Sequence, residues 1–133
     1  MTLRRQFDLL GEDETFLGEY CLSWETIVDG SPWVLLHDFP APDGYNLSLV
    51  VAAIRLETGY PNAGLDMVYF HPPLARKDGK PIGGTQATQQ IDGKAFQRWS
   101  RHRTSLNPWK IGYDNLGTHI MLIEDWLQRE FLQ

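Results

Sequence analysis

Cysteine is nearly absent from this sequence of 133 residues, which holds only Cys21. A single thiol excludes an internal disulfide, and no group of cysteines and histidines has the spacing of a zinc site. A reducing compartment is therefore the default expectation. We also expect no bound metal and no cofactor.

Long apolar runs are missing too. The longest, residues 47–54, is interrupted by Ser48 and is far too short to cross a bilayer. The first residues, Met-Thr-Leu-Arg-Arg-Gln-Phe-Asp, contain no apolar segment of the kind that a secretory signal requires. The sequence therefore predicts a cytoplasmic protein that does not associate with membranes.

Positive charge is in short supply. The 12 lysines and arginines stand against 17 aspartates and glutamates, which gives a formal net charge of -5. A general binder of nucleic acid needs clustered positive charge for the phosphate backbone, so the composition argues against a nucleic-acid partner. The local group Arg98, Arg101 and Arg103 is about equally consistent with a small basic patch and with a solvated turn.

The residues that are abundant are typical of a folded domain. Hydrophobic residues make up 42% of the chain and charged residues 22%, a balance that disordered chains do not have. The length suits one domain over residues 1–133 and is sufficient to bury a core. We find no internal repeat and no low-complexity segment.

The apolar pattern changes along the chain from helical to strand-like. The first 20 residues have helical spacing and predict one or two short helices that end near residues 18–21. Four β-branched or aromatic segments follow, and turn residues bound each of them. They cover residues 24–28, 33–39, 47–56 and 65–70. Short connections predict an antiparallel meander, and the almost unbroken apolar run of the third segment predicts a central strand buried on both faces.

Regular patterning stops after residue 73. Residues 74–98 are rich in Gly, Lys, Gln and Thr and predict a long irregular segment. Asp114 is a suitable N-cap for a last helix. The apolar side chains of this helix recur at helical spacing: Leu116, Ile120, Ile123, Leu127 and Phe131. The predicted fold class is α+β, a four-stranded antiparallel meander with an N-terminal and a C-terminal helix packed on it.

A series of short motifs occurs in a fixed order along the chain. They are Trp33-Val34-Leu35-Leu36, Phe39-Pro40, Gly44-Tyr45-Asn46, Gly59-Tyr60-Pro61-Asn62-Ala63, Asp66-Met67, Pro72-Pro73-Leu74, Trp99-Ser100-Arg101-His102 and Asn107-Pro108-Trp109. The series resembles the ubiquitin-conjugating enzymes, and most closely their prokaryotic branch, from about residue 17 onward. The resemblance implies the ubiquitin-conjugating-enzyme-like fold and a role in a bacterial ubiquitin-like conjugation pathway. It also implies two partners, an adenylating activating enzyme and a ubiquitin-like protein.

The resemblance fails at the catalytic cysteine. Conjugating enzymes carry an activated acyl group as a thioester, because a thiolate is a strong nucleophile near neutral pH. In the family that thiol lies somewhat before the tryptophan landmark, which is Trp109 here. Counting back leads to Ser100, Arg101 and His102, and none of them is a cysteine. The segment His71-Pro72-Pro73 shares only the first two residues of the family's His-Pro-Asn motif.

Cys21 is a poor replacement for the missing thiol. It precedes the first strand, and the family fold places that region away from the active-site segment. A lone cysteine in an apolar setting also behaves more often as a small hydrophobe than as a nucleophile.

Ser100 and His102 offer a different nucleophile. A hydroxyl can carry an acyl group as an oxyester when a base removes its proton, and residues two apart share one face of a strand. The sequence does not identify a carboxylate that would orient His102. The plainer interpretation is that both side chains bind the backbone of an irregular segment while Trp99 fills the core. His119, near the start of the last helix, has the spacing of a surface residue.

Three hypotheses for function follow. The first is an adaptor that binds the activating enzyme or the ubiquitin-like protein without a cysteine thioester. The second is an active acyl carrier that uses Ser100 with His102. The third is a small-molecule-binding domain unrelated to conjugation, with a pocket between the long irregular segment and the sheet.

Overall fold

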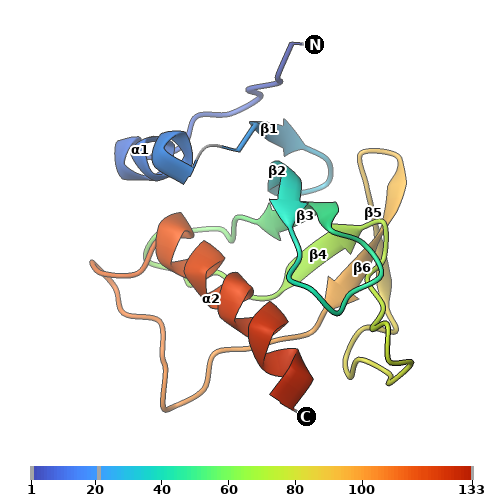
Figure 1. Cartoon of the computed structure of the whole chain (residues 1–133). Coiled ribbons are helices and arrows are strands. Elements are labelled where there is room, and N and C mark those ends of the chain that lie inside the picture. The colour runs from blue at the N-terminus through green and yellow to red at the C-terminus, as the bar shows by residue number, and fades with distance from the viewer. Residues whose placement is uncertain (1, 21, 133) are drawn as a thin grey trace.

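A curled antiparallel sheet with a helix from each end of the chain forms the structure (Figure 1). The computed structural model describes residues 2–20 and 22–132, so Cys21 lies outside the described residues. The helices and strands are α1 (Gly11–Tyr20), β1 (Trp24–Val28), β2 (Pro32–Pro40), β3 (Leu49–Arg55), β4 (Val68–His71), β5 (Thr88–Ile91), β6 (Lys94–Trp99), α2 (Leu116–Arg129) and the 3₁₀ turn η1 (Glu130–Leu132). Both predicted helical regions and all four predicted strand regions are therefore present.

The sheet contains six strands within the described residues, in the order β1-β2-β3-β4-β6-β5. Strands β1 to β4 form the predicted antiparallel meander. The prediction of four strands was wrong because residues 74–98 contain β5 and most of β6. These two strands form a hairpin around Asp92 and Gly93, which both have positive φ, as a two-residue type I′ turn requires. Strand β5 exposes Thr88, Gln89 and Gln90, so it lacks the apolar alternation that marks a strand.

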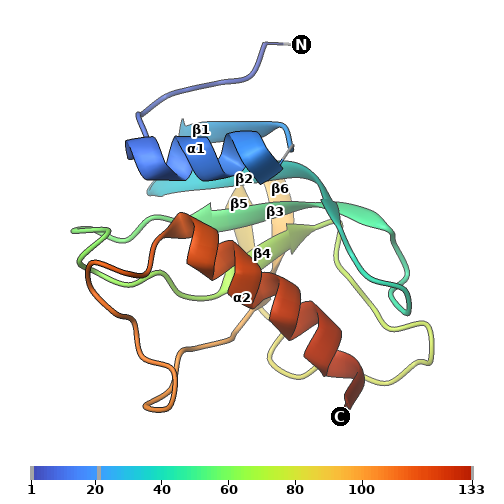
Figure 2. The ribbon, with the colours of Figure 1, turned by 60° about the vertical axis from the view of Figure 1, so that its left-hand side comes forward.

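Strand β3 is covered on both faces, as its apolar run predicts. Ala52 and Ile54 belong to the larger apolar cluster, which also contains the buried residues of α2. Ala53 belongs to a second cluster on the other face, with Trp33 and Phe96. The curl of the sheet brings the β5–β6 hairpin over that second face, and Figure 2 shows α2 lying across the first.

Helix α2 begins one residue later than the sequence suggests. Its N-cap is Asn115, whose side chain accepts the N–H of Thr118 in a capping box. Asp114 instead accepts the backbone N–H of Lys110 at 2.8 Å and pairs with Arg103 at 3.4 Å. The predicted apolar stripe is otherwise correct, since four of its five members are buried on this helix: Leu116, Ile120, Ile123 and Leu127.

The hydroxyl of Tyr60 joins the two helices. It accepts the N–H of Leu116 at 2.7 Å and donates to the carboxylate of Asp13 at 2.7 Å. Burial raises the pKa of the Asp13 carboxyl and that of the Tyr60 hydroxyl. The Tyr-Pro landmark of the sequence therefore fixes the start of α2 against α1. No helix among the described residues is long and apolar enough to cross a membrane.

Candidate functional site

The candidate site begins where β6 ends. Trp99, the last residue of β6, is fully buried in the main cluster. The next residue, Ser100, is only partly exposed, and its N–H donates to the carbonyl of Gly84 at 2.9 Å. The buried indole and this backbone bond together fix the position of the Ser100 hydroxyl at the edge of the core.

Ser100, His102 and Asp66 form one hydrogen-bonded series. The hydroxyl of Ser100 lies 3.2 Å from Nε2 of His102, and Nδ1 of His102 lies 2.7 Å from the Asp66 carboxylate. When Nδ1 carries the proton toward Asp66, Nε2 is free to accept the proton of the serine. A nucleophile, a base and an orienting carboxylate in this order are the requirements for activating a hydroxyl. The side chains of His102 and Asp66 are 58% and 36% exposed, so an incoming substrate can reach them.

Asp66 was not identifiable as part of the site from the sequence, because it lies 36 residues before His102. Asp66 lies beside Ser100 and His102 because hydrogen bonds to both backbone groups of the next residue, Met67, fix the turn that carries it. Met67 has a positive φ of 60°. Its N–H donates to the carbonyl of Arg101 at 3.1 Å, and its carbonyl accepts from Nε2 of His119 at 2.8 Å. The only advance signal was that Asp66-Met67 belongs to the motif series.

His119 is a buried structural residue, so the prediction of a surface position was wrong. Its side chain is fully enclosed and stands against the ring of Trp126. Burial lowers the pKa of its imidazole to about 4, so the ring is neutral at physiological pH. Because it donates to Met67, it links α2 to the turn that carries Asp66.

Arg101, which lies between Ser100 and His102 in the sequence, anchors this segment through its side chain. Its guanidinium donates to the carbonyl of Gly83 at 2.8 Å and pairs at 3.2 Å with Glu130, which is buried in η1. Glu130 also lies 3.5 Å from Arg76, which is buried. The residue between Ser100 and His102 is thus tied to the C-terminal end of the fold.

The other residues considered from the sequence lie elsewhere. His71 ends β4, and its Nδ1 lies 3.0 Å from the carbonyl of Ala95, so His71 is not part of the series. Arg101 and Arg103 are each paired with a carboxylate and do not form an open basic patch. Among residues 2–20 and 22–132, no group of three or more His, Cys, Asp or Glu is placed to hold a metal ion.

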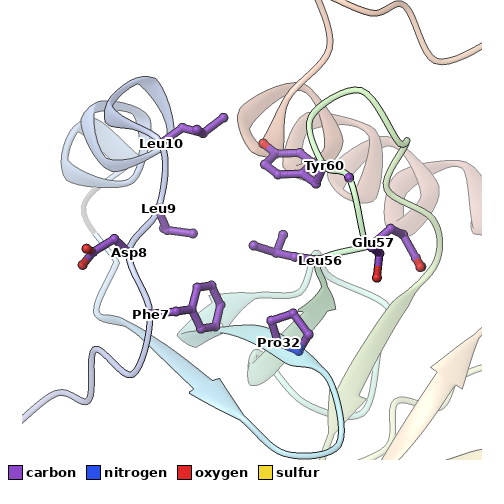
Figure 3. A pocket seen from close by; sticks show the side chains of 10 residues that line it. Phe7, Asp8, Leu9, Leu10, Pro32, Leu56, Glu57 and Tyr60 are labelled. Atoms are coloured by element: carbon purple, nitrogen blue, oxygen red, sulfur yellow. The ribbon is translucent and has the colours of Figure 1, made fainter.

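Two cavities bear on the candidate functions. One of about 380 Å³ opens beside His102 and is lined by the loop after it and by the Leu122, Trp126 and Arg129 side of α2. The other, of about 220 Å³, lies between the N-terminal segment and the turn after β3 (Figure 3). Apolar side chains such as Phe7, Leu9 and Leu56 point into the second cavity. It contains none of the three residues of the series.

The six-stranded antiparallel sheet and the two helices define a protein of the α+β class. The sequence matches the family described as Prokaryotic E2 family E over residues 9–130, and the chain belongs to that family. No curated protein and no solved structure matches the chain.

Proposed function

We propose that this protein is an E2-like acyl carrier of a bacterial, cytoplasmic ubiquitin-like conjugation pathway and that Ser100 replaces the usual cysteine. The observation that carries the proposal is the hydrogen-bonded series Asp66, His102 and Ser100. Ser100 and His102 lie in the segment before Trp109, where the resemblance to conjugating enzymes places the thiol. Membership of the prokaryotic E2 family supports the conjugation role.

The first half-reaction loads the serine. An activating enzyme presents the ubiquitin-like protein with its terminal carboxyl activated as a thioester or an acyl adenylate. The Ser100 oxygen attacks the acyl carbon, Nε2 of His102 takes the hydroxyl proton, and the bond from the acyl carbon to the thiolate or AMP breaks. The products are an oxyester on Ser100 and the free leaving group, while Asp66 holds the imidazolium in place.

The second half-reaction releases the acyl group. An amine of the acceptor attacks the ester carbon, an amide forms, and the bond from that carbon to the Ser100 oxygen breaks. His102 has by then given its first proton to the leaving group or to solvent, so its Nε2 takes a proton from the attacking amine and passes it to the departing serine oxygen. The serine hydroxyl and the neutral imidazole are thereby restored. An oxyester reacts with amines more slowly than a thioester, so base catalysis by His102 is needed in both directions; general bases contribute about 10²–10⁴-fold.

Loading of the serine is tested by incubating the protein with activating enzyme, ATP and the ubiquitin-like protein. We expect an adduct that survives thiol reductant and is cleaved by hydroxylamine, and Ser100→Ala should abolish it. Ser105→Ala is the matched control, because Ser105 is an exposed serine in the same segment. An adduct that persists in Ser100→Ala would exclude Ser100 as the carrier.

The second candidate function is an adaptor, which binds the activating enzyme or the ubiquitin-like protein and forms no covalent intermediate. The absence of a cysteine between Trp99 and Trp109 favours it. Calorimetric binding without any covalent species on a denaturing gel is the result expected of an adaptor. That result would contradict the acyl-carrier proposal.

A further inference from the structure

The free edge of the sheet lies beside the candidate nucleophile. Strand β5 is the last strand in the sheet order, and no strand among the described residues pairs with its outer side. Its residues Thr88, Gln89 and Gln90 are exposed. A strand edge of this kind presents unpaired backbone groups that can bind an extended peptide.

The register of the hairpin identifies which backbone groups face outward. Ile91 and Lys94 flank the two-residue turn and therefore form a hydrogen-bonded pair. Bonded and non-bonded pairs alternate, so the backbone of Gln89 faces β6 while that of Thr88 and Gln90 faces away. Within the described part of the chain, the outward groups of Thr88 and Gln90 have one hydrogen bond, a long one of 3.3 Å from the side chain of Gln89 to the carbonyl of Gln90.

This edge leads directly to Ser100. The pairing with β6 continues beyond β5, since the N–H of Arg98 donates to Ala87 at 2.9 Å and that of Ser100 to Gly84 at 2.9 Å. Gly84 has a positive φ of 70°, and a Cβ there would lie 3.0 Å from Nη1 of Arg101 and 3.5 Å from Cβ of Ser100. Because residues 83 and 84 are both glycines, no side chain of theirs separates the edge from the serine.

We infer that the outer edge of β5 binds the extended carboxyl-terminal tail of the ubiquitin-like protein as an added antiparallel strand. The inference rests on the proposed function, because the group that reaches Ser100 is then the terminal carboxyl of a protein. The residues before that carboxyl must cross the surface next to the serine. Strand β5 runs away from Ser100, so a tail whose carboxyl end points toward Ser100 runs antiparallel to it.

The tail pairs with the outward N–H and C=O groups of Thr88 and Gln90 and then crosses Gly83 and Gly84 to the serine. A second copy of this chain is a less suitable occupant. The exposed side chains of the strand are polar and the strand has only four residues, which is how natural proteins discourage edge-to-edge pairing of like strands.

Amide hydrogen exchange on this protein tests the inference. The probe is the ubiquitin-like protein of the adduct assay, added to the Ser100→Ala variant so that no covalent bond is needed. We expect slower exchange at Thr88 and Gln90, and no slowing when the added protein lacks its carboxyl-terminal tail. Binding with unchanged exchange at both amides, or no binding, overturns the inference. Protection that grows with protein concentration without the probe would indicate a second copy and also overturns it.

Proline substitution gives an independent test. Gln90→Pro removes an outward N–H without breaking a bond to β6, whereas Gln90→Ala keeps that N–H. One lost hydrogen bond weakens binding of the tail by about fivefold. We therefore expect a fivefold increase in the apparent KM for loading of Gln90→Pro and no change for Gln90→Ala. Retained slow exchange at Gln89 verifies that the hairpin is intact, and equal KM values in both variants contradict the inference.

The two proposals fail in different ways. An adduct on Ser100 with no effect at β5 leaves the acyl-carrier function standing and removes the docking edge. Tail-dependent protection at Thr88 and Gln90 without any adduct keeps the docking edge and supports an adaptor instead.

Discussion

At the scale of single residues, Asp66 makes the partly exposed Ser100 and the exposed His102 a candidate for covalent chemistry. Its carboxylate lies 2.7 Å from Nδ1 of His102 and fixes which ring nitrogen faces Ser100. Without that bond the imidazole could present either nitrogen to the hydroxyl.

Replacing Asp66 tests this role. Asp66→Asn keeps the shape but can donate to Nδ1, which places the proton on Nε2 and prevents it from accepting the serine proton. We expect the rate of adduct formation in a single turnover to fall by about 100-fold, within the usual range for general-base catalysis, with the apparent KM unchanged. Asp125→Asn is the control, because Asp125 makes only an exposed pair with Arg129. An equal loss in both variants would show that the effect is not specific to the hydrogen-bonded series of Asp66, His102 and Ser100.

His119 supplies a second prediction at this scale, for stability rather than activity. Its pKa is lowered from 6.5 to about 4 in the folded protein, so the unfolded chain binds more protons between these values. This residue therefore contributes stability that is fully present above pH 6.5 and is lost as the pH falls through about 4. His119→Leu removes that contribution and leaves the Met67 carbonyl unpaired, which costs about 1–3 kcal/mol.

Urea unfolding of the two proteins between pH 4 and 7 measures the difference. The difference in unfolding free energy between the wild-type protein and His119→Leu should decrease as the pH falls. The raised pKa of Asp13 acts in the opposite direction but affects both proteins alike. A difference that does not depend on pH would show that His119 ionises equally in the folded and unfolded states.

At the scale of elements, α2 covers the sheet with one apolar stripe and also supports the site through His119. The stripe was predictable because helical spacing is visible in the sequence. The exact start was not, since Asp114 and Asn115 are both good N-cap residues and only the capping box with Thr118 selects Asn115. Strands β5 and β6 were missed for a different reason. Polar residues dominate the exposed strand β5, and a hairpin at the edge of a sheet needs no apolar alternation.

Truncation in the stripe measures what α2 contributes. Ile123 is fully buried, and Ile123→Ala should cost about 2–5 kcal/mol of unfolding free energy because it leaves a cavity. Met121 lies on the same helix but is 59% exposed, so Met121→Ala should change stability by less than about 0.5 kcal/mol. Similar losses in a denaturant titration would mean that α2 does not pack as described.

At the scale of the whole molecule, the site is assembled from segments that are distant in sequence. Ser100 follows the sixth strand, Asp66 precedes the fourth, and Glu130 follows the last helix. The sequence proposed Ser100 and His102 as candidates because they are close together and precede the tryptophan landmark, Trp109. It did not identify Asp66 or the Glu130–Arg101 pair, because only tertiary folding brings them next to the serine.

The most direct measurement uses the Ser100→Cys variant, which restores the cysteine whose role Ser100 is proposed to take. Ser100→Cys should still be loaded by the activating enzyme, but its adduct should be a thioester that thiol reductant cleaves, whereas the wild-type adduct resists reductant. Intact-mass analysis before and after reduction distinguishes the two. An adduct on Ser100→Cys that still resists reductant, or the absence of any adduct on the wild-type protein, would contradict the assignment of Ser100 as the acyl carrier.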